Sequence, residues 1–240
     1  MIKFIVGNQT VTFDVEKIQK LKKIGVAFSG GTDSSLILCL LAKYVPDIEI
    51  VPWYGIEFWD LDGLNFVKKA YKKIVINYPN ANILPMRYFG IDKEDLIWEE
   101  VFFNNYKNKD ESNLDFMTVI KRFIIDQYKK EYIDTGLTNV NTFGTLMAPP
   151  KDECIKYGFD KYVQPYRWDT TGSEWNMNSV KIWQPLKFVN KKFVAGMFKK
   201  EGLIDWLYSD LQHSVPCKKE SCFGCFERKW AFSTYDGGLI

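Results

Sequence analysis

Histidine and arginine are both scarce in this sequence of 240 residues. It contains a single histidine, His213, and four arginines, Arg87, Arg122, Arg167 and Arg228. The 32 lysines and arginines nearly balance the 30 aspartates and glutamates, which leaves a formal net charge of +2. Such a balance gives no reason to expect a long nucleic-acid track or a strongly acidic partner. We therefore expect no nucleic acid among the partners of this protein.

Long apolar runs are also absent. No stretch approaches the roughly 20 uninterrupted apolar residues of a membrane span, and residues 1–5 alternate with polar residues instead of forming a signal core. We expect a cytoplasmic protein without membrane contact. The five cysteines are an odd number, which favours metal or redox chemistry over disulfides when no signal peptide is present. Cys39 lies in an apolar run, so we predict a core position for it.

The order of strand-like and helix-like segments predicts an α/β fold with a doubly wound, mostly parallel sheet. Strands are predicted at residues 2–6, 10–14, 24–28, 48–53, 83–89 and 132–136, and helices at 36–44, 64–76, 93–106, 114–131, 191–200 and 203–211. The first two strands form a hairpin within residues 1–15, which we expect to cap a sheet edge. Residues 148–180 are rich in Pro, Asp, Gly, Asn and Trp, which predicts irregular loops that select the substrate.

A glycine-rich loop follows the predicted strand 24–28 and leads into the helix that comes next. Free backbone N–H groups and the positive end of the helix dipole meet at such a loop, so it is suited to bind an anion. Asp33 would repel a bare phosphate, and we interpret it as a ligand of Mg²⁺ or a cap of the helix amides. The alternative is that the whole segment only caps a helix. The candidate binding residues are Phe28, Ser29, Gly30, Gly31, Thr32, Asp33, Ser34 and Ser35.

A second glycine, Gly136, ends the predicted strand 132–136. Open α/β sheets bind their ligands at the carboxyl ends of the strands, so Gly136 is a candidate for the same site. Asp60, Asp62 and Arg167 are polar candidates for the substrate side, with surface or capping positions as the alternative. The aromatic residues after the strand 48–53 could stack on a purine-like ring or simply pack against the core; they are Trp53, Tyr54, Phe58 and Trp59.

Four potential metal ligands lie close together near the carboxyl end of the chain. They are His213, Cys217, Cys222 and Cys225, a set that suits tetrahedral Zn²⁺ in a closed structural site. The fourth ligand could instead be Cys154 or come from a partner chain. We predict one large domain, residues 1–211, with the cysteine-rich segment 212–240 packed on it as a small zinc-binding appendage.

The segment 26–35, Val-Ala-Phe-Ser-Gly-Gly-Thr-Asp-Ser-Ser, resembles the SGGxDS signature of the PP-loop ATP pyrophosphatases. This group includes asparagine synthetases, NAD synthetases, tRNA thiolases and 7-cyano-7-deazaguanine synthases. The resemblance implies a fold of the adenine nucleotide alpha hydrolase type. It also implies adenylation with ATP and Mg²⁺, in which a substrate oxygen attacks the α-phosphorus and pyrophosphate leaves into the loop.

The last third of the chain is similar to the end of 7-cyano-7-deazaguanine synthases. The similar segments are 183–186, 190–192, 200–203 and 214–225. The resemblance implies ATP-dependent conversion of 7-carboxy-7-deazaguanine and ammonia to the 7-cyano nucleobase (preQ0), as in queuosine biosynthesis, and a possible homodimer. It also matches Lys191 to a lysine that neutralises phosphate charge during catalysis; the alternative is an ordinary solvated lysine.

Three departures from that family leave other functions open. The zinc loop of the family has four cysteines where this chain has three, and its Tyr-Gly-Gln appears here as Tyr54-Gly55-Ile56. The segment after Gly136 also lacks the family's Asp-x-x-Gly-Tyr-Pro-Asp-Cys pattern. One alternative is an RNA thiolase, some of which carry a three-cysteine iron–sulfur cluster. The other is a protein that binds ATP to regulate or modify a partner, for example in a defence complex.

Overall fold

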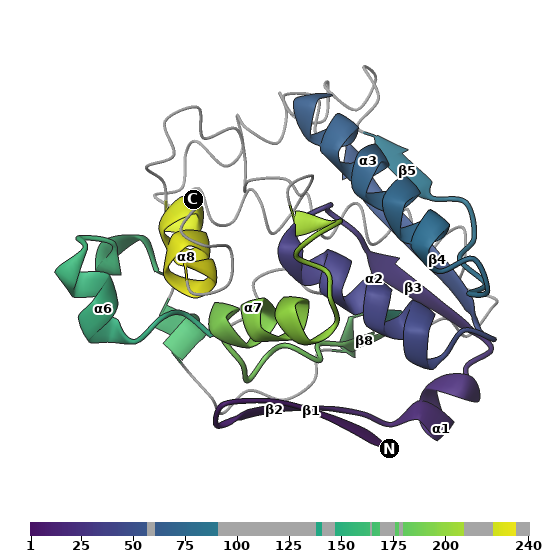
Figure 1. Ribbon diagram of the computed structural model, residues 1–240, viewed down its shortest axis with the longest axis horizontal. Helices are drawn as coiled ribbons and strands as arrows, with labels where there is room; N and C mark the ends of the chain where they lie inside the picture. Colours follow the sequence, from purple (N-terminus) through teal and green to yellow (C-terminus); the bar gives the residue numbers. More distant parts are fainter. Residues whose placement is uncertain are drawn as a thin grey trace.

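The computed structural model describes residues 1–56, 61–90, 138–140, 147–163, 165–168, 176–177, 180–208 and 223–233, and the structural statements below concern these residues. Six strands form one sheet in the order β5-β4-β3-β6-β8-β7 (Figure 1). All neighbours in it are parallel except β7 and β8. The predicted mostly parallel sheet is therefore confirmed. Its strands are β3 (Lys23–Ala27), β4 (Glu49–Ile56), β5 (Arg87–Gly90), β6 (Thr138–Val140), β7 (Asn176–Met177) and β8 (Val180–Trp183).

β3 is central because it pairs with β4 on one side and β6 on the other. Val26 lies opposite Pro52 of β4 and Val140 of β6. Both Ile24 and Val26 are fully buried. A continuous apolar run of this kind is typical of a parallel strand covered on both faces. Because all three strands run the same way, the carboxyl end of β3 opens at the edge where the glycine-rich loop begins.

Three helices pack around this loop. α2 (Thr32–Tyr44) contacts β3, β4, α3 (Leu61–Asn77) and α7 (Lys191–Lys200). Figure 1 shows α2 and α3 lying over the strands β3 to β5. Nearly every residue of α2 from Ser34 to Ala42 is buried, as expected for a helix with neighbours on all sides. Cys39 is buried in this core, as predicted.

The amino-terminal hairpin does not cap the edge of the large sheet, so that prediction is wrong. β1 (Ile2–Val6) and β2 (Gln9–Phe13) form a two-stranded sheet of their own, and β1 packs on α7. The alternating pattern places Phe4 and Phe13 on one face, where their ring centroids lie 5.0 Å apart. On this apolar face, the ring of Phe4 lies against Tyr44 of α2 and the ring of Phe13 against Trp183 of β8. A short helix, α1 (Val15–Gln19), follows.

Other segments depart from the sequence predictions in local structure. Residues 203–208 form turns instead of the predicted start of a helix. The region 148–180 contains a short helix, α6 (Lys151–Lys156), and two 3-10 turns, η2 (Asp160–Tyr162) and η3 (Pro165–Trp168). The sequence predicts irregular loops there, and its local pattern does not reveal β8.

The helix α8 (Phe223–Phe232) is not predicted either, because Cys222 to Cys225 has the sequence of a metal-binding turn. Phe223 and Phe226 pack against a small second core made by Ala148, Cys154 and Val163. At the other end of α8, Phe232 is fully buried in the main core. The helix therefore joins the two cores, and neither end of it can bury its apolar side chains without the rest of the fold.

Several predictions concern residues outside those that the structure describes. They are the helices at 93–106 and 114–131, the strand at 132–136, and residues 209–211 of the last predicted helix. Helices on both faces of the sheet, as in a doubly wound fold, therefore stay a prediction. Among the helices that are described, none is both long and apolar enough to cross a membrane.

Replacing Phe13 tests whether the hairpin belongs to the main core. Phe13 is fully buried, and its ring lies 4.9 Å from that of Trp183, so Phe13→Ala removes contacts to both the hairpin and the sheet. We expect it to lower the free energy of unfolding by about 3–5 kcal/mol. The exposed neighbour Thr12→Ala should cost less than about 1 kcal/mol. Urea unfolding measures both, and equal small losses would show that the hairpin is not part of the cooperative core.

Candidate anion-binding site

The glycine-rich loop connects the carboxyl end of β3 to the first turn of α2. Phe28 begins it as a buried anchor, and its N–H donates to the Trp53 carbonyl of β4 at 2.8 Å. Gly30 then takes a left-handed backbone conformation with φ of +70°. A Cβ at Gly30 would lie 2.9 Å from the Cα of Val67 in α3. Both the conformation and the close contact therefore require glycine at this position.

Hydroxyl groups within the loop hold its shape. The Ser34 hydroxyl accepts from the Ser29 N–H at 3.2 Å and donates to the Gly31 carbonyl at 3.3 Å. The hydroxyl oxygens of Ser29 and Ser34 are also 3.2 Å apart. These bonds turn Ser34 back toward the loop. The loop is therefore shaped before any ligand is bound.

The amino terminus of α2 has no side-chain cap. Its N-cap residue is Gly31, and no side chain within the described part of the protein bonds to the first amides as a cap. The Ser35 hydroxyl in the first turn is buried, and we find no hydrogen-bond partner for it among the described residues. Open amides at a helix amino terminus bind anions, and an unsatisfied buried hydroxyl needs a polar partner. The loop residues present therefore fit a phosphate group.

Asp33 makes a partly buried ion pair with Lys191. The Lys191 Nζ lies 2.6 Å and 2.7 Å from the two carboxylate oxygens of Asp33. The Thr32 hydroxyl donates to the same carboxylate at 3.1 Å. The side chains of Lys191 and Asp33 are 12% and 21% exposed, so a small ligand could still reach the pair. Asp33 does not cap the helix, and that part of its interpretation is wrong.

Lys191 reaches this position because it is the first residue of α7. Asn190 is the N-cap, and its side-chain oxygen accepts from the Lys192 N–H at 3.0 Å. The Lys192 ammonium points elsewhere and lies 4.4 Å from the ring centroid of Trp230 in α8. A lysine at a helix amino terminus is disfavoured by the helix dipole. Asp33 offsets this unfavourable placement, so each member of the pair supports the other.

The residues that would hold a metal are only partly described. Asp33 supplies one carboxylate, which fits the usual binding of Mg²⁺ by one or two carboxylates together with substrate phosphates. Within the described ranges there is no group of three His, Cys, Asp or Glu residues arranged to hold a metal ion. Of the predicted zinc ligands, Cys225 is buried in the first turn of α8. The other three, His213, Cys217 and Cys222, lie outside the described residues, as does Gly136.

Cys154, the alternative fourth zinc ligand, lies in the small second core. Burial raises the pKa of its thiol above the ordinary value, and the nearby Glu227 carboxylate raises it further. The Cys154 thiol donates to the Pro149 carbonyl at 3.7 Å, and its core neighbours are Ala148 and Val163, which agrees with a structural position. Burial also raises the pKa of the Cys39 thiol, which agrees with its place in the main core.

Those substrate-side candidates that the structure describes are paired with other residues or buried in the fold. Arg167 pairs with the buried Glu227 of α8 at 2.5 Å and donates to the Met147 carbonyl at 3.4 Å. Trp53 and Tyr54 are both buried, which favours the packing interpretation. For Phe58, Trp59 and Asp60, and for the side chain of Asp62, the predictions fall outside the described part of the chain.

Two residues near the site were missed by the sequence analysis. Asn190 could have been identified, because Asn directly before a helical pattern is a common N-cap. Gln9 could not, since it bonds to Asn190 across 181 residues of sequence. No local pattern marks a contact of that kind.

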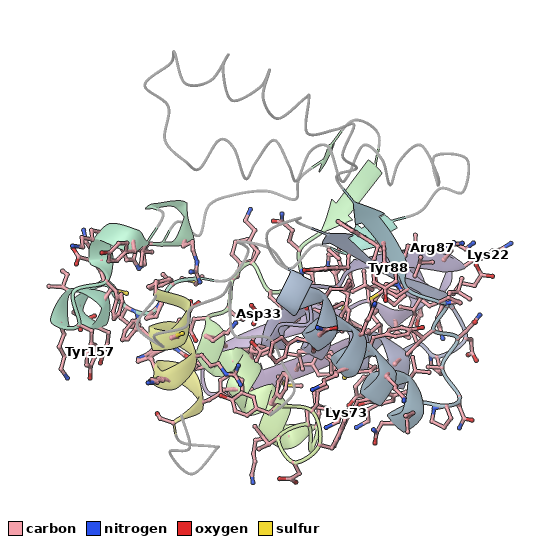
Figure 2. All side chains as sticks on the ribbon, turned by 90° about the horizontal axis from the view of Figure 1, so that it is seen from above. Lys22, Asp33, Lys73, Arg87, Tyr88 and Tyr157 are labelled. Atoms are coloured by element: carbon pink, nitrogen blue, oxygen red, sulfur yellow. The ribbon has the colours of Figure 1, made fainter. Side chains whose placement is uncertain are left out.

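Fold and site together define a class: a mostly parallel α/β protein with a glycine-rich loop, suited to bind an anion, at the carboxyl end of its central strand. Figure 2 shows Asp33 near the middle of the molecule, between α6, where Tyr157 is labelled, and the opposite side with Arg87 and Tyr88. No protein-family model matches the sequence, and no curated protein does.

The solved structures to which this chain is similar include two enzymes. One is the U34-tRNA thiolase NcsA from Methanococcus maripaludis with its 4Fe-4S cluster, with 16% identity, coverage of 99% of this chain and 82% of that chain, and a TM-score of 0.47. Another is the glutamine-dependent NAD+ synthetase from Acinetobacter baumannii in complex with ADP, with 12% identity, coverage of 85% and 34%, and a TM-score of 0.49. Both TM-scores are below 0.5, so neither protein's chemistry is transferred to this chain.

Gly30→Ala tests the contact between the loop and α3. Gly202 has nearly the same backbone conformation, with φ of +67°, but a Cβ added there would meet nothing within 4 Å. Gly202→Ala should therefore cost only the left-handed conformation, about 1–2 kcal/mol. Gly30→Ala adds the clash with Val67 and should cost about 1–3 kcal/mol more. Urea unfolding of both variants measures the difference, and equal losses would contradict the close contact.

Proposed function

We propose that this protein is an ATP-dependent adenylating enzyme of the PP-loop type, which splits ATP into AMP and pyrophosphate. The observation that carries the proposal is the Asp33–Lys191 pair at the uncapped amino terminus of α2. It places one ammonium group, a row of open amides and one carboxylate at a single point. Each of these groups has a use in handling a polyphosphate.

The loop is suited to the charge that develops during adenylation. A substrate oxygen forms a bond to the α-phosphorus of ATP, the bond from that phosphorus to the bridging oxygen breaks, and negative charge collects on the departing pyrophosphate. Amides of the first turn of α2 and the Lys191 ammonium lie where that charge would be stabilised. Asp33 would hold Mg²⁺, which supplies further positive charge to the phosphates when bound.

For the acceptor we propose 7-carboxy-7-deazaguanine with ammonia as the nitrogen donor. Ammonia would displace AMP from the adenylated carboxylate to give the carboxamide, and a second ATP would adenylate the amide oxygen, whose loss with AMP leaves 7-cyano-7-deazaguanine. The support is the resemblance of the segments 183–186, 190–192, 200–203 and 214–225 to 7-cyano-7-deazaguanine synthases. The same resemblance supports a homodimer, structural zinc at the carboxyl end and a cytoplasmic location, all of which belong to the proposal.

Mixing the purified protein with Mg-ATP, ammonium and 7-carboxy-7-deazaguanine tests activity directly. We expect AMP, pyrophosphate and the nitrile by mass spectrometry. Asp33→Ala and Lys191→Ala should each lower kcat/KM by about 100-fold or more, since each removes a charged group next to the phosphates. Lys192→Ala removes an equal charge one residue away, where the ammonium faces Trp230, and should change kcat/KM less than about threefold.

Other outcomes of this assay distinguish the proposed adenylation with ATP from the proposed deazaguanine acceptor. ATP binding without any nitrile would exclude the deazaguanine acceptor and leave adenylation of another carboxylate or of RNA to be tested. Good ATP binding without pyrophosphate release from any acceptor would point to a regulatory ATP-binding protein. Absence of ATP binding would contradict the proposed function as a whole.

Metal analysis of the purified protein tests the cysteine-rich segment. We expect about one zinc per chain and no visible absorbance, as for a four-ligand structural site. Cys225→Ser should remove the metal, whereas Cys154→Ser should leave it bound, because Cys154 lies in the small core with Ala148 and Val163. A brown protein with visible absorbance would instead indicate an iron–sulfur cluster and favour the RNA thiolase alternative.

A further inference from the structure

Gln9 in the hairpin makes a two-point contact with Asn190 at the start of α7. The Gln9 Nε2 donates to the Asn190 side-chain oxygen at 3.1 Å, and the Asn190 N–H donates to the Gln9 Oε1 at 2.7 Å. That same Asn190 oxygen accepts the Lys192 N–H that begins the helix. The N-cap of α7 is therefore held from outside by one side chain of β2.

Two more contacts bind the hairpin to α7 further along its length. Gly196 lies so close to β1 that a Cβ there would be 2.3 Å from the Val6 Cγ1. At the end of the helix, the Lys200 Nζ donates to the Ile5 carbonyl. The three contacts at residues 190, 196 and 200 span about 15 Å of helix at 1.5 Å per residue. They therefore define both the rotation and the axial position of α7.

Other elements also hold the ends of α7 by hydrogen bonds. The Met147 N–H donates to the Val189 carbonyl at 2.9 Å, and the Glu201 carboxylate accepts from Lys43 and Tyr44 of α2. The buried side chains of α7, among them Phe193, Val194 and Phe198, pack in the main core. Apolar burial is non-directional and depends mainly on the area removed from water. Hydrogen bonds require donor and acceptor distances near 3 Å, so they resist a shift of the helix along its axis.

The position of Lys191 depends directly on this placement. Lys191 follows Asn190 in the chain, and its ammonium contacts both oxygens of Asp33. A helix shift of one residue moves each backbone atom by about 1.5 Å, which is enough to break such a contact. Misplacement of a reacting group by about 1 Å can lower a rate by 100-fold. Support for Lys191 thus comes from a segment far from it in the sequence.

We infer that Gln9 is a positioning residue, which acts through Asn190 to hold Lys191 against Asp33 and, by extension, against a bound polyphosphate. The second half of this inference rests on the proposed function, and the first half does not. A role in overall stability alone would leave the interaction between Lys191 and Asp33 unchanged. The interaction itself is therefore the quantity to measure.

The first experiment measures the coupling between Asp33 and Lys191 by a double-mutant cycle in urea unfolding. Asp33→Asn, Lys191→Met and the double variant are compared in the native background and in Gln9→Ala. We expect a coupling of about fivefold in the unfolding equilibrium constant with Gln9, and about twofold or less with alanine at that position. The exposed neighbour Asn8→Ala serves as the matched control and should leave the coupling at its native value. An unchanged coupling in Gln9→Ala would overturn the inference.

The second experiment measures Mg-ATP affinity by calorimetry for the same Gln9 and Lys191 variants. Gln9→Ala should weaken binding about five- to tenfold, the effect of roughly one hydrogen-bonded contact. In the Lys191→Met background, Gln9→Ala should have almost no effect on affinity, because the ammonium that Gln9 positions is absent. Additive losses would overturn the positioning role. If no variant binds Mg-ATP but the coupling still falls, the proposed function fails and the positioning of Lys191 by Gln9 stands.

Discussion

The ion pair between Asp33 and Lys191 joins the starts of two helices that are 158 residues apart in the chain. Asp33 is in the first turn of α2, where the helix dipole favours an anion. Lys191 is the first residue of α7, where the dipole disfavours a cation unless an anion is near. Both helices are placed by the rest of the fold: α2 follows the central strand β3, and α7 packs on the hairpin, α2 and α8. The Asp33–Lys191 contact therefore depends on the placement of both helices.

A polyphosphate at this loop would be a second anion for the same ammonium. The amides of α2 have no side-chain cap among the described residues, and the Ser29 and Ser34 hydroxyls hold the loop without covering its helix end. Gly30 lets the loop approach α3 closely enough that no side chain would fit. The site thus combines open donors with a rigid backbone, which lowers the reorganisation needed when charge develops.

Local sequence patterns predicted the parts of the fold that depend on short-range interactions. The helix 191–200 is confirmed at both ends, and the hairpin strands and the strand before the loop are confirmed to within a residue or so. The predictions are wrong where contacts with residues distant in the sequence determine the structure. Residues 223–232 form a helix that spans two cores, and the hairpin covers α7 and not a sheet edge. No nearby residue carries the information for either arrangement.

The sequence by itself determined the glycine-rich loop, because a strand, two glycines and a run of hydroxyl residues produce it through short-range backbone and hydroxyl contacts. The family resemblance of residues 190–192 also singled out Lys191, with an ordinary solvated lysine as the alternative. Only the tertiary structure shows how the side chains of this lysine and its neighbours are directed. Lys187 lies over the ring of Phe188, Lys192 over that of Trp230, and Lys191 contacts Asp33. The direction of each side chain depends on how α7 is rotated, and that rotation depends on packing in the main core and on contacts with the hairpin at the other end of the chain.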